Sequence, residues 1–193
     1  MKKEKNKNSV LVLIALIFIF SLICFSEKAY AAEPKITETL ITNDVANVLL
    51  YARLVNGFKP EMEMAILAGI PTVFTMYLEV YQERPLLWDK RIIKKEIRRT
   101  LKYDNLKKTF NVFFNGKTEP VVFSDLESAK KAMSDFDGII AAPMSSLMKG
   151  ENYYALAKVK MDKVRLPLKM EYVLFFVSIW DFETSWYRHK FSY

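Results

Sequence analysis

The sequence offers few of the side chains that catalyse reactions or bind metals. His189 is the only histidine and Cys24 the only cysteine, so one chain cannot assemble a zinc site of nitrogen and sulfur ligands. His189 lies four residues from the end of the sequence, where order is often poor, so we do not expect it to serve in a catalytic triad. The few glycines are not clustered, so there is no phosphate-binding loop. We therefore expect no cofactor and no catalytic residue.

Carboxylates are the remaining candidates for catalysis. Glu79 and Glu83 would share one face of a strand and lie about 13 Å apart, at about 3.3 Å per residue. The paired carboxylates of glycosidases lie roughly 5–9.5 Å apart, so this pair is too widely spaced. A hydrolase that combines carboxylates from different strands is left as an alternative hypothesis.

Two stretches combine tryptophan with charged residues near the ends of apolar patterns. In the first, at residues 83–89, Pro85 lacks a backbone donor and should end the preceding strand. An indole there would either cover the edge of a sheet or contact a partner. The second stretch, at residues 180–187, allows the same two interpretations. The candidate partner-binding residues are Glu83, Arg84, Trp88, Asp89, Trp180, Asp181, Trp186 and Tyr187.

Strands must position these side chains, because alternation with period two dominates the sequence. Apolar residues alternate with polar ones at 48–54, 74–80, 93–103, 110–114 and 153–161. Asp104-Asn105 and Asn115-Gly116 fall between these segments and predict tight hairpin turns. Connections this short cannot join parallel strands. We therefore predict an α+β, mainly β fold: antiparallel sheets in a sandwich-like arrangement with two short helices.

The two helices are predicted from their end signals. Pro60 opens the first, which ends before Gly69. The second begins with a capping box at Ser124 and Glu127, continues with an apolar stripe that includes Phe136, and ends at Gly138. The apolar run Tyr172–Trp180 fits either a helix or a buried strand, and its β-branched and aromatic content favours a central strand.

The first 31 residues have the layout of a secretory signal peptide. Four lysines precede the apolar run Val10–Phe25, and the Ala29-x-Ala31 pattern predicts cleavage after Ala31. The run would be roughly 24 Å long as a helix, shorter than the roughly 30 Å core of a bilayer. An uncleaved Val10–Phe25 segment anchored in the inner membrane is the alternative, and a lipoprotein acylated at Cys24 is a weaker one. We predict a periplasmic or otherwise extracytoplasmic single domain at residues 32–193.

Residues 90–99 form a strongly basic segment. The whole chain has a formal net charge of +7, and without the signal peptide 24 basic and 20 acidic residues leave +4. Alternation would turn the charges of this segment toward solvent, where lysines on an exposed strand also oppose aggregation. The functional interpretation is attraction to an acidic partner or an anionic membrane surface. Nucleic acid is not expected as a partner outside the cytoplasm.

Several motifs, taken in order, resemble a family of exported proteobacterial proteins that carry a domain of unknown function. They comprise Gly69-Ile70-Pro71, Glu83-Arg84-Pro85, Trp88-Asp89, Leu101-Lys-Tyr103 with Leu106, Phe110-x-Val112, Leu126-Glu127-x-Ala129, Arg165-Leu166-Pro167, Trp180-Asp181 and Ser185-Trp186-Tyr187. The resemblance covers residue 36 to the C-terminus. It implies an extracytoplasmic protein that is often encoded near a membrane sensor kinase of the nitrogen-response type.

Together these observations favour a non-enzymatic envelope protein that binds another protein, as an accessory to envelope signalling with a membrane sensor kinase as one candidate partner. Export, the missing catalytic groups and the tryptophan stretches motivate this hypothesis. A module that binds lipid or another hydrophobic ligand is the first alternative, because 14% of the residues are aromatic. The carboxylate-only hydrolase is the second.

Overall fold

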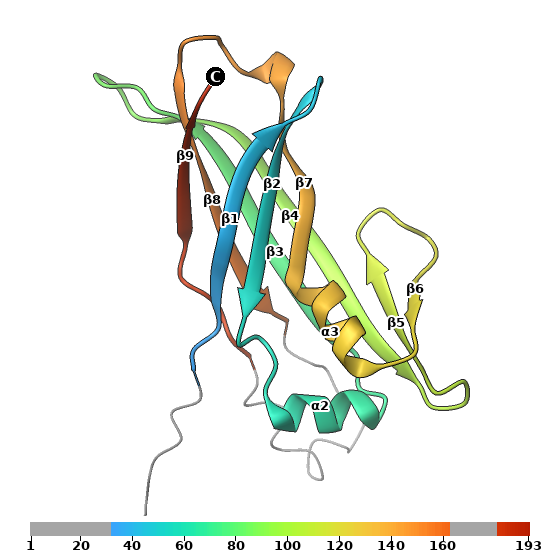
Figure 1. Cartoon of the computed structure of the whole chain (residues 1–193). Helices are drawn as coiled ribbons and strands as arrows, with labels where there is room; N and C mark the ends of the chain where they lie inside the picture. The colour runs from blue at the N-terminus through green and yellow to red at the C-terminus, as the bar shows by residue number, and fades with distance from the viewer. Residues whose placement is uncertain (1–31, 163–180) are drawn as a thin grey trace, which may run out of the picture. The chain divides into compact units, whose positions relative to one another are not determined.

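The computed structural model describes residues 32–162 and 181–193 (Figure 1), which form two antiparallel sheets and two α-helices. The three-stranded sheet has the order β1-β2-β7, and the six-stranded sheet has the order β6-β5-β4-β3-β8-β9. The strands are β1 (Lys35–Asn43), β2 (Asn47–Val55), β3 (Thr72–Gln82), β4 (Lys90–Asp104), β5 (Thr109–Phe114), β6 (Val121–Phe123), β7 (Asp135–Pro143), β8 (Asn152–Met161) and β9 (Tyr187–Ser192). The helices are α2 (Pro60–Leu67) and α3 (Leu126–Ser134), with a 3-10 turn, η1, at Met144–Ser146. The predicted mainly β fold is confirmed.

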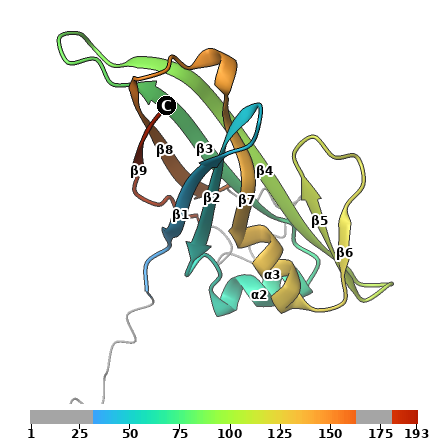
Figure 2. The same cartoon turned by 45° about the horizontal axis from the view of Figure 1, so that its top comes forward.

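The two sheets face each other (Figures 1 and 2), and the hydrophobic core contains buried residues from both of them. Alternate residues of β3 point inward and are fully buried, namely Phe74, Met76, Leu78 and Val80. The matching face of β8 contributes Tyr153, Ala155, Ala157, Val159 and Met161. Burying a large apolar side chain stabilises a fold by about 1.5–3 kcal/mol, so these central strands provide a rigid support for the loops at their ends.

Both predicted connections join antiparallel strands, but each is longer than a two-residue turn, with residues 105–108 in the first and 115–120 in the second. The Asp104 carboxylate accepts hydrogen bonds from the backbone N–H groups of Leu106 (2.9 Å) and Lys107 (3.0 Å) and closes the β4–β5 hairpin. Gly116 has a φ of +80°, which glycine adopts without strain. The chain nevertheless continues to Val121 before β6 begins, so this connection is longer than a two-residue hairpin.

The second helix differs from its prediction at both ends. Asp125, and not Ser124, is the N-cap, and its carboxylate accepts from the Ser128 N–H at 2.8 Å. An ionised acceptor also interacts favourably with the helix dipole, which explains the preference. The helix ends at Ser134 because Phe136 pairs with Ala52 of β2. Gly138, which we expected to end the helix, lies within β7.

Some predictions concern residues outside the described part. The signal peptide at 1–31, the cleavage site, Trp180 and the Tyr172–Trp180 strand all belong to this group. Within the described residues, no helix has the length and apolarity needed to cross a membrane.

Candidate functional site

The connection between β3 and β4, here called the hairpin tip (residues 83–89), carries three consecutive exposed apolar side chains. Leu86 is 96% exposed, Leu87 67% and Trp88 91%. Figures 1 and 2 show the tip projecting beyond the strands that precede and follow it. Single exposed leucines are ordinary, but a contiguous apolar group on a projecting loop is typical of a contact surface. Trp88 is therefore too exposed to cover the sheet edge.

The backbone of the tip is held by the side chain of Arg84. Its Nε donates to the carbonyl oxygen of Trp88 at 2.8 Å, and its Nη2 donates to the same oxygen. The N–H of Leu87 donates to the Arg84 carbonyl at 3.2 Å, and the N–H of Arg84 donates to the Asp89 carboxylate at 3.2 Å. The apolar side chains are therefore presented by a loop that is closed by its own hydrogen bonds.

Tyr154 of β8 joins the tip to the outer face of the six-stranded sheet. Its hydroxyl donates to Asp89 Oδ2 at 2.9 Å, and its ring stacks on Tyr81 of β3 with centroids 5.2 Å apart. Burial and the bond to Asp89 raise the pKa of Tyr154 to about 12. The same bond, followed by that from the Arg84 N–H, lowers the pKa of Asp89. Both groups therefore remain in the hydrogen-bonding state that braces the loop at neutral pH.

The edge strand β9 supplies the second brace. The Arg188 guanidinium lies 3.7 Å above the Tyr154 ring, and its Nη2 lies 2.8 Å from Glu83 Oε1. Lys190 Nζ lies 2.9 Å from the same oxygen. An isolated surface ion pair contributes little, but here two cations and a stacked tyrosine converge on one loop. Glu83, Arg84 and Asp89 thus hold the tip in shape, which leaves Trp88 and the two leucines facing outward.

Trp186 and Tyr187 lie on the same sheet but away from the tip. Tyr187 pairs with Ala157, whereas the N–H of Glu83 bonds to the carbonyl of Asn152. Five residues of β8 separate these positions, or about 16 Å at about 3.3 Å per residue. Trp186 is half exposed, and Lys158 Nζ lies 4.7 Å from its ring centroid. The two tryptophan stretches therefore do not form one cluster, and the exposed Asp181 precedes the second.

Of the residues that brace the tip, Glu83, Arg84 and Asp89 were predicted as candidate site residues, whereas those on the neighbouring strands were not. Tyr81, Tyr154 and Arg188 come from three strands that are neighbours only in the folded sheet. The sequence could have indicated the two tyrosines, because the alternation places them on the outward-facing side of their strands, where an aromatic side chain needs a partner. The pair Leu86-Leu87 is evident in the sequence, but no neighbouring residue indicates whether these leucines stay exposed or fold back against the edge of the sheet.

The basic segment at 90–99 is only partly a solvated face. Lys94 and Arg98 are exposed as predicted, but Arg99 is only 4% exposed. Its Nη1 donates to the carbonyl oxygens of Ala132 (2.7 Å) and Asp135 (2.5 Å). The prediction is wrong at this position because the C-terminus of α3 leaves carbonyls without intrahelical partners, and these favour a cation.

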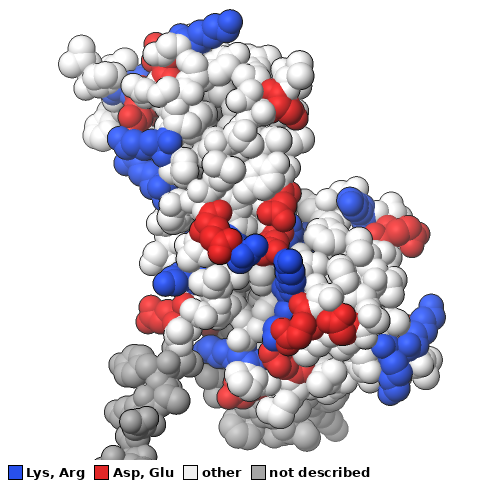
Figure 3. Space-filling model, in the orientation of Figure 1, with Lys and Arg blue, Asp and Glu red and all other residues white. Residues whose placement is uncertain are grey.

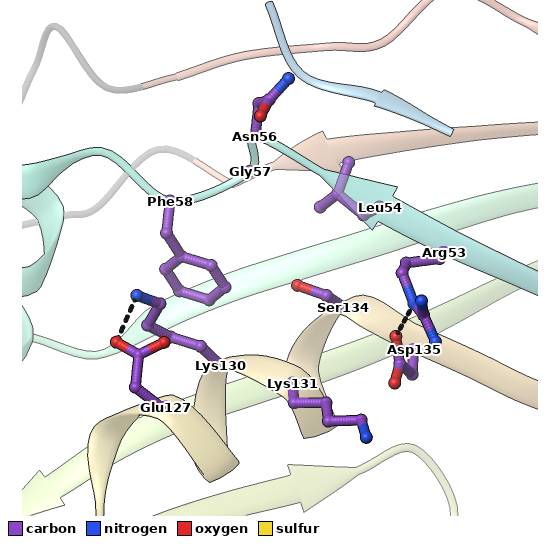
Figure 4. A pocket seen from close by; sticks show the side chains of 10 residues that line it. All are labelled: Arg53, Leu54, Asn56, Gly57, Phe58, Glu127, Lys130, Lys131, Ser134 and Asp135. Carbon is purple, nitrogen blue, oxygen red and sulfur yellow. Dashed lines mark hydrogen bonds and ion pairs between the residues drawn. The ribbon is translucent and has the colours of Figure 1, made fainter. Parts of the chain in front are cut away.

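A pocket between the end of β2 and α3 is a weaker candidate site (Figure 4). Its volume is about 400 Å³, and charged side chains from both elements line it. Lys130 pairs with Glu63 (2.6 Å) and Glu127 (2.7 Å), and Arg53 pairs with Asp135 (2.7 Å). Figure 3 shows acidic and basic side chains interspersed on this face. Because these charges already neutralise one another, the pocket offers no strong attraction for an ion.

The described residues include no group of three or more His, Cys, Asp or Glu side chains placed to hold a metal ion. In comparisons with known proteins, the model of a family described as a domain of unknown function (DUF4390) matches residues 31–190. No curated protein and no solved structure matches the chain.

Proposed function

Because the chain belongs to the DUF4390 family, whose domain has no assigned function, we propose a function from its own surface. The protein is an exported, non-enzymatic component of the cell envelope that acts by binding another protein. The hairpin tip carries this proposal, since Leu86, Leu87 and Trp88 are exposed in a loop that the rest of the domain braces. The basic, apolar and small-residue order of residues 1–31 supports export to the periplasm or anchoring by Val10–Phe25.

The bracing favours binding because it reduces the entropy lost on association. Fixing the backbone of one residue costs about 1–2 kcal/mol. At the tip, Arg84 and Asp89 already hold the backbone, so this part of the cost of ordering a loop in an interface is met when the domain folds. Tryptophan is also among the residues most enriched at the energetic centres of interfaces. We assign Trp88 as the central contact and Leu86 and Leu87 as its apolar neighbours.

The partner class follows from the location. A protein exported with an inner-membrane leader meets other proteins of the envelope, and the family resemblance points to a membrane sensor kinase as one candidate. We therefore place this protein as an accessory to envelope signalling. The pocket in Figure 4 is lined by paired charges, so it favours neither a hydrophobic ligand nor a carboxylate-only hydrolase.

Site-specific crosslinking in native cells tests this function. A photoreactive amino acid would replace Trp88 in the full chain, and crosslinked species would be identified by mass spectrometry. Leu106 is the matched control because it is apolar and 96% exposed, close to the 91% of Trp88, but lies in the β4–β5 connection. We expect a defined envelope protein captured at position 88 and not at 106. Equal capture at both positions, or none at 88, would reject the tip as the protein-binding surface.

A further inference from the structure

Three loops at one end of the two-sheet domain present exposed apolar side chains. Val45 in the β1–β2 turn is fully exposed, and Met148, which follows η1, is 57% exposed. The hairpin tip contributes Leu86, Leu87 and Trp88. Figures 1 and 2 both show the β1–β2 turn, the β7–β8 connection and the hairpin tip at this end. We call these five residues the apolar end.

The backbone of each loop is hydrogen-bonded within the protein. In the β1–β2 turn, the Asp44 carboxylate accepts from the N–H groups of Ala46 (2.7 Å) and Asn47 (2.6 Å). In the β7–β8 connection, the N–H of Met148 donates to the Tyr153 hydroxyl at 2.8 Å. The tip is closed by Arg84 and Asp89, as described above. Paired backbone groups matter near hydrocarbon, because unpaired ones there cost several kcal/mol.

The charges at this end leave a small basic excess. Glu83 is paired with Arg188 and Lys190, whereas Asp44 and Asp89 accept hydrogen bonds but keep their negative charge, and Glu151 in the β7–β8 connection adds another. Lys90, directly after the tip, and Lys149, directly after Met148, are exposed. A lysine beside apolar side chains can reach headgroup phosphates while its neighbours enter the interfacial layer, where tryptophan is also enriched.

We infer that the apolar end rests on a bilayer that contains anionic lipid, with Leu86, Leu87 and Trp88 entering its interfacial layer. This inference rests on the proposed function for its location in the envelope. It deepens that function, because the protein partner would then be one embedded in the same membrane, which would contact Trp88 and the two leucines within the interfacial layer. The rigid tip sets the orientation, since β3 and β4 connect it directly to the sheet core.

Quenching by brominated lipid tests the inference at a defined position. In full-length protein purified from the envelope, Trp180→Phe with Trp186→Phe leaves Trp88 as the only tryptophan. The control adds Trp88→Tyr and Leu106→Trp, which moves the indole to the far end of β4, about 50 Å away at about 3.3 Å per residue. Vesicles would contain brominated phosphatidylethanolamine with phosphatidylglycerol, or brominated phosphatidylcholine alone.

In the anionic vesicles, we expect the brominated lipid to quench the fluorescence of Trp88 but not that of the indole at position 106. Leu86→Asp should weaken partitioning about tenfold, since it replaces an apolar contact by a charge that the headgroups repel. Absence of Trp88 quenching, or an unchanged partition of Leu86→Asp, overturns the inference. A protein crosslinked at position 88 despite unquenched Trp88 would overturn membrane docking alone and leave the proposed function standing.

Discussion

Replacing Arg99 with methionine or alanine separates two opposing contributions of a buried guanidinium. The side chain donates to the carbonyls of Ala132 and Asp135, and its guanidinium carbon lies 4.1 Å from the ring centroid of Phe136 and 5.1 Å from that of Phe114. Its buried Nε has no hydrogen-bond partner among the described residues. Arg99 therefore gains hydrogen bonds and ring contacts but loses hydration.

The two contributions oppose each other. Hydrogen bonds that involve a charged group contribute about 1.5–3 kcal/mol each, so losing the two short ones costs about 3–6 kcal/mol. Burial lowers the pKa of Arg99 from 12.5 to about 10, which corresponds to about 3 kcal/mol of lost stabilisation of its charged form. Arg99→Met keeps an apolar contact with Phe136 and removes both contributions, so it should lower the free energy of unfolding by about 0–3 kcal/mol. Arg99→Ala also opens a cavity and should destabilise by about 2–4 kcal/mol more than Arg99→Met.

Urea denaturation followed by far-ultraviolet circular dichroism measures these differences. Arg98→Met is the control, because Arg98 lies on the exposed face of the same strand and makes one ion pair, with Asp162, at 3.3 Å. A surface pair contributes about 0–1 kcal/mol, so the control should differ little from the wild type. If Arg99→Met destabilises as much as Arg99→Ala, the hydrogen bonds dominate and the balance argued above is wrong.

Three further predictions concern the tip and one turn. Tyr154→Phe removes the hydroxyl that holds Asp89 but keeps the stacked ring, so hydrogen exchange of the Leu87 amide should accelerate about five- to tenfold by mass spectrometry. The fold lowers the pKa of Asp89 below its ordinary value of 3.8. The ionised carboxylate therefore stabilises the tip above pH 3.8, and this stabilisation is lost as the pH falls through the lowered pKa. Asp89→Asn should remove that acid dependence of the Leu87 amide signal in NMR spectra. Gly116→Ala should lower stability by about 1–2 kcal/mol in thermal unfolding through its φ of +80° alone, because open space surrounds the added methyl group, and Gly116→Asn should be milder. An unchanged exchange rate of the Leu87 amide in Tyr154→Phe would contradict the first argument, and an unchanged acid dependence of its signal in Asp89→Asn would contradict the second. An unchanged melting temperature of Gly116→Ala would contradict the third.

The alternation of apolar and polar residues predicted the central strands, because β4 and β8, the two neighbours of β3, turn inward the same alternate positions as β3 does. Glu79 pairs with Lys94 on one side and Leu156 on the other, so the inward and outward positions stay in phase across three strands. The first strand was missed because its phase changes within it. Glu38 has a φ of +50°, and the register with β2 shifts between Thr37 and Leu40. A bulge of this kind interrupts alternation and hides a strand from a periodicity argument.

The helix and strand at residues 126–143 show a different limit. Phe136 continues the apolar stripe of Ala129 and Met133 at helical spacing, so local sequence favoured one longer helix. In the fold, residue 136 pairs with Ala52 of β2, more than eighty positions earlier in the chain. A distant partner can override local propensity, and periodicity in a short window does not contain that information.

The exposure of Trp88 depends on contacts that no single stretch of sequence reveals. An indole on a short loop could lower its exposed area by folding back onto aromatic residues of the outer face. That surface is already occupied, because Tyr81 and Tyr154 stack on each other and Arg188 covers the Tyr154 ring. The Arg84 side chain also donates to the carbonyl of Trp88 and fixes its backbone within the loop. The fold thus uses several polar contacts to keep a large apolar side chain in water, an arrangement that stabilises the isolated domain only weakly, whereas the proposed docking of the tip would bury the indole.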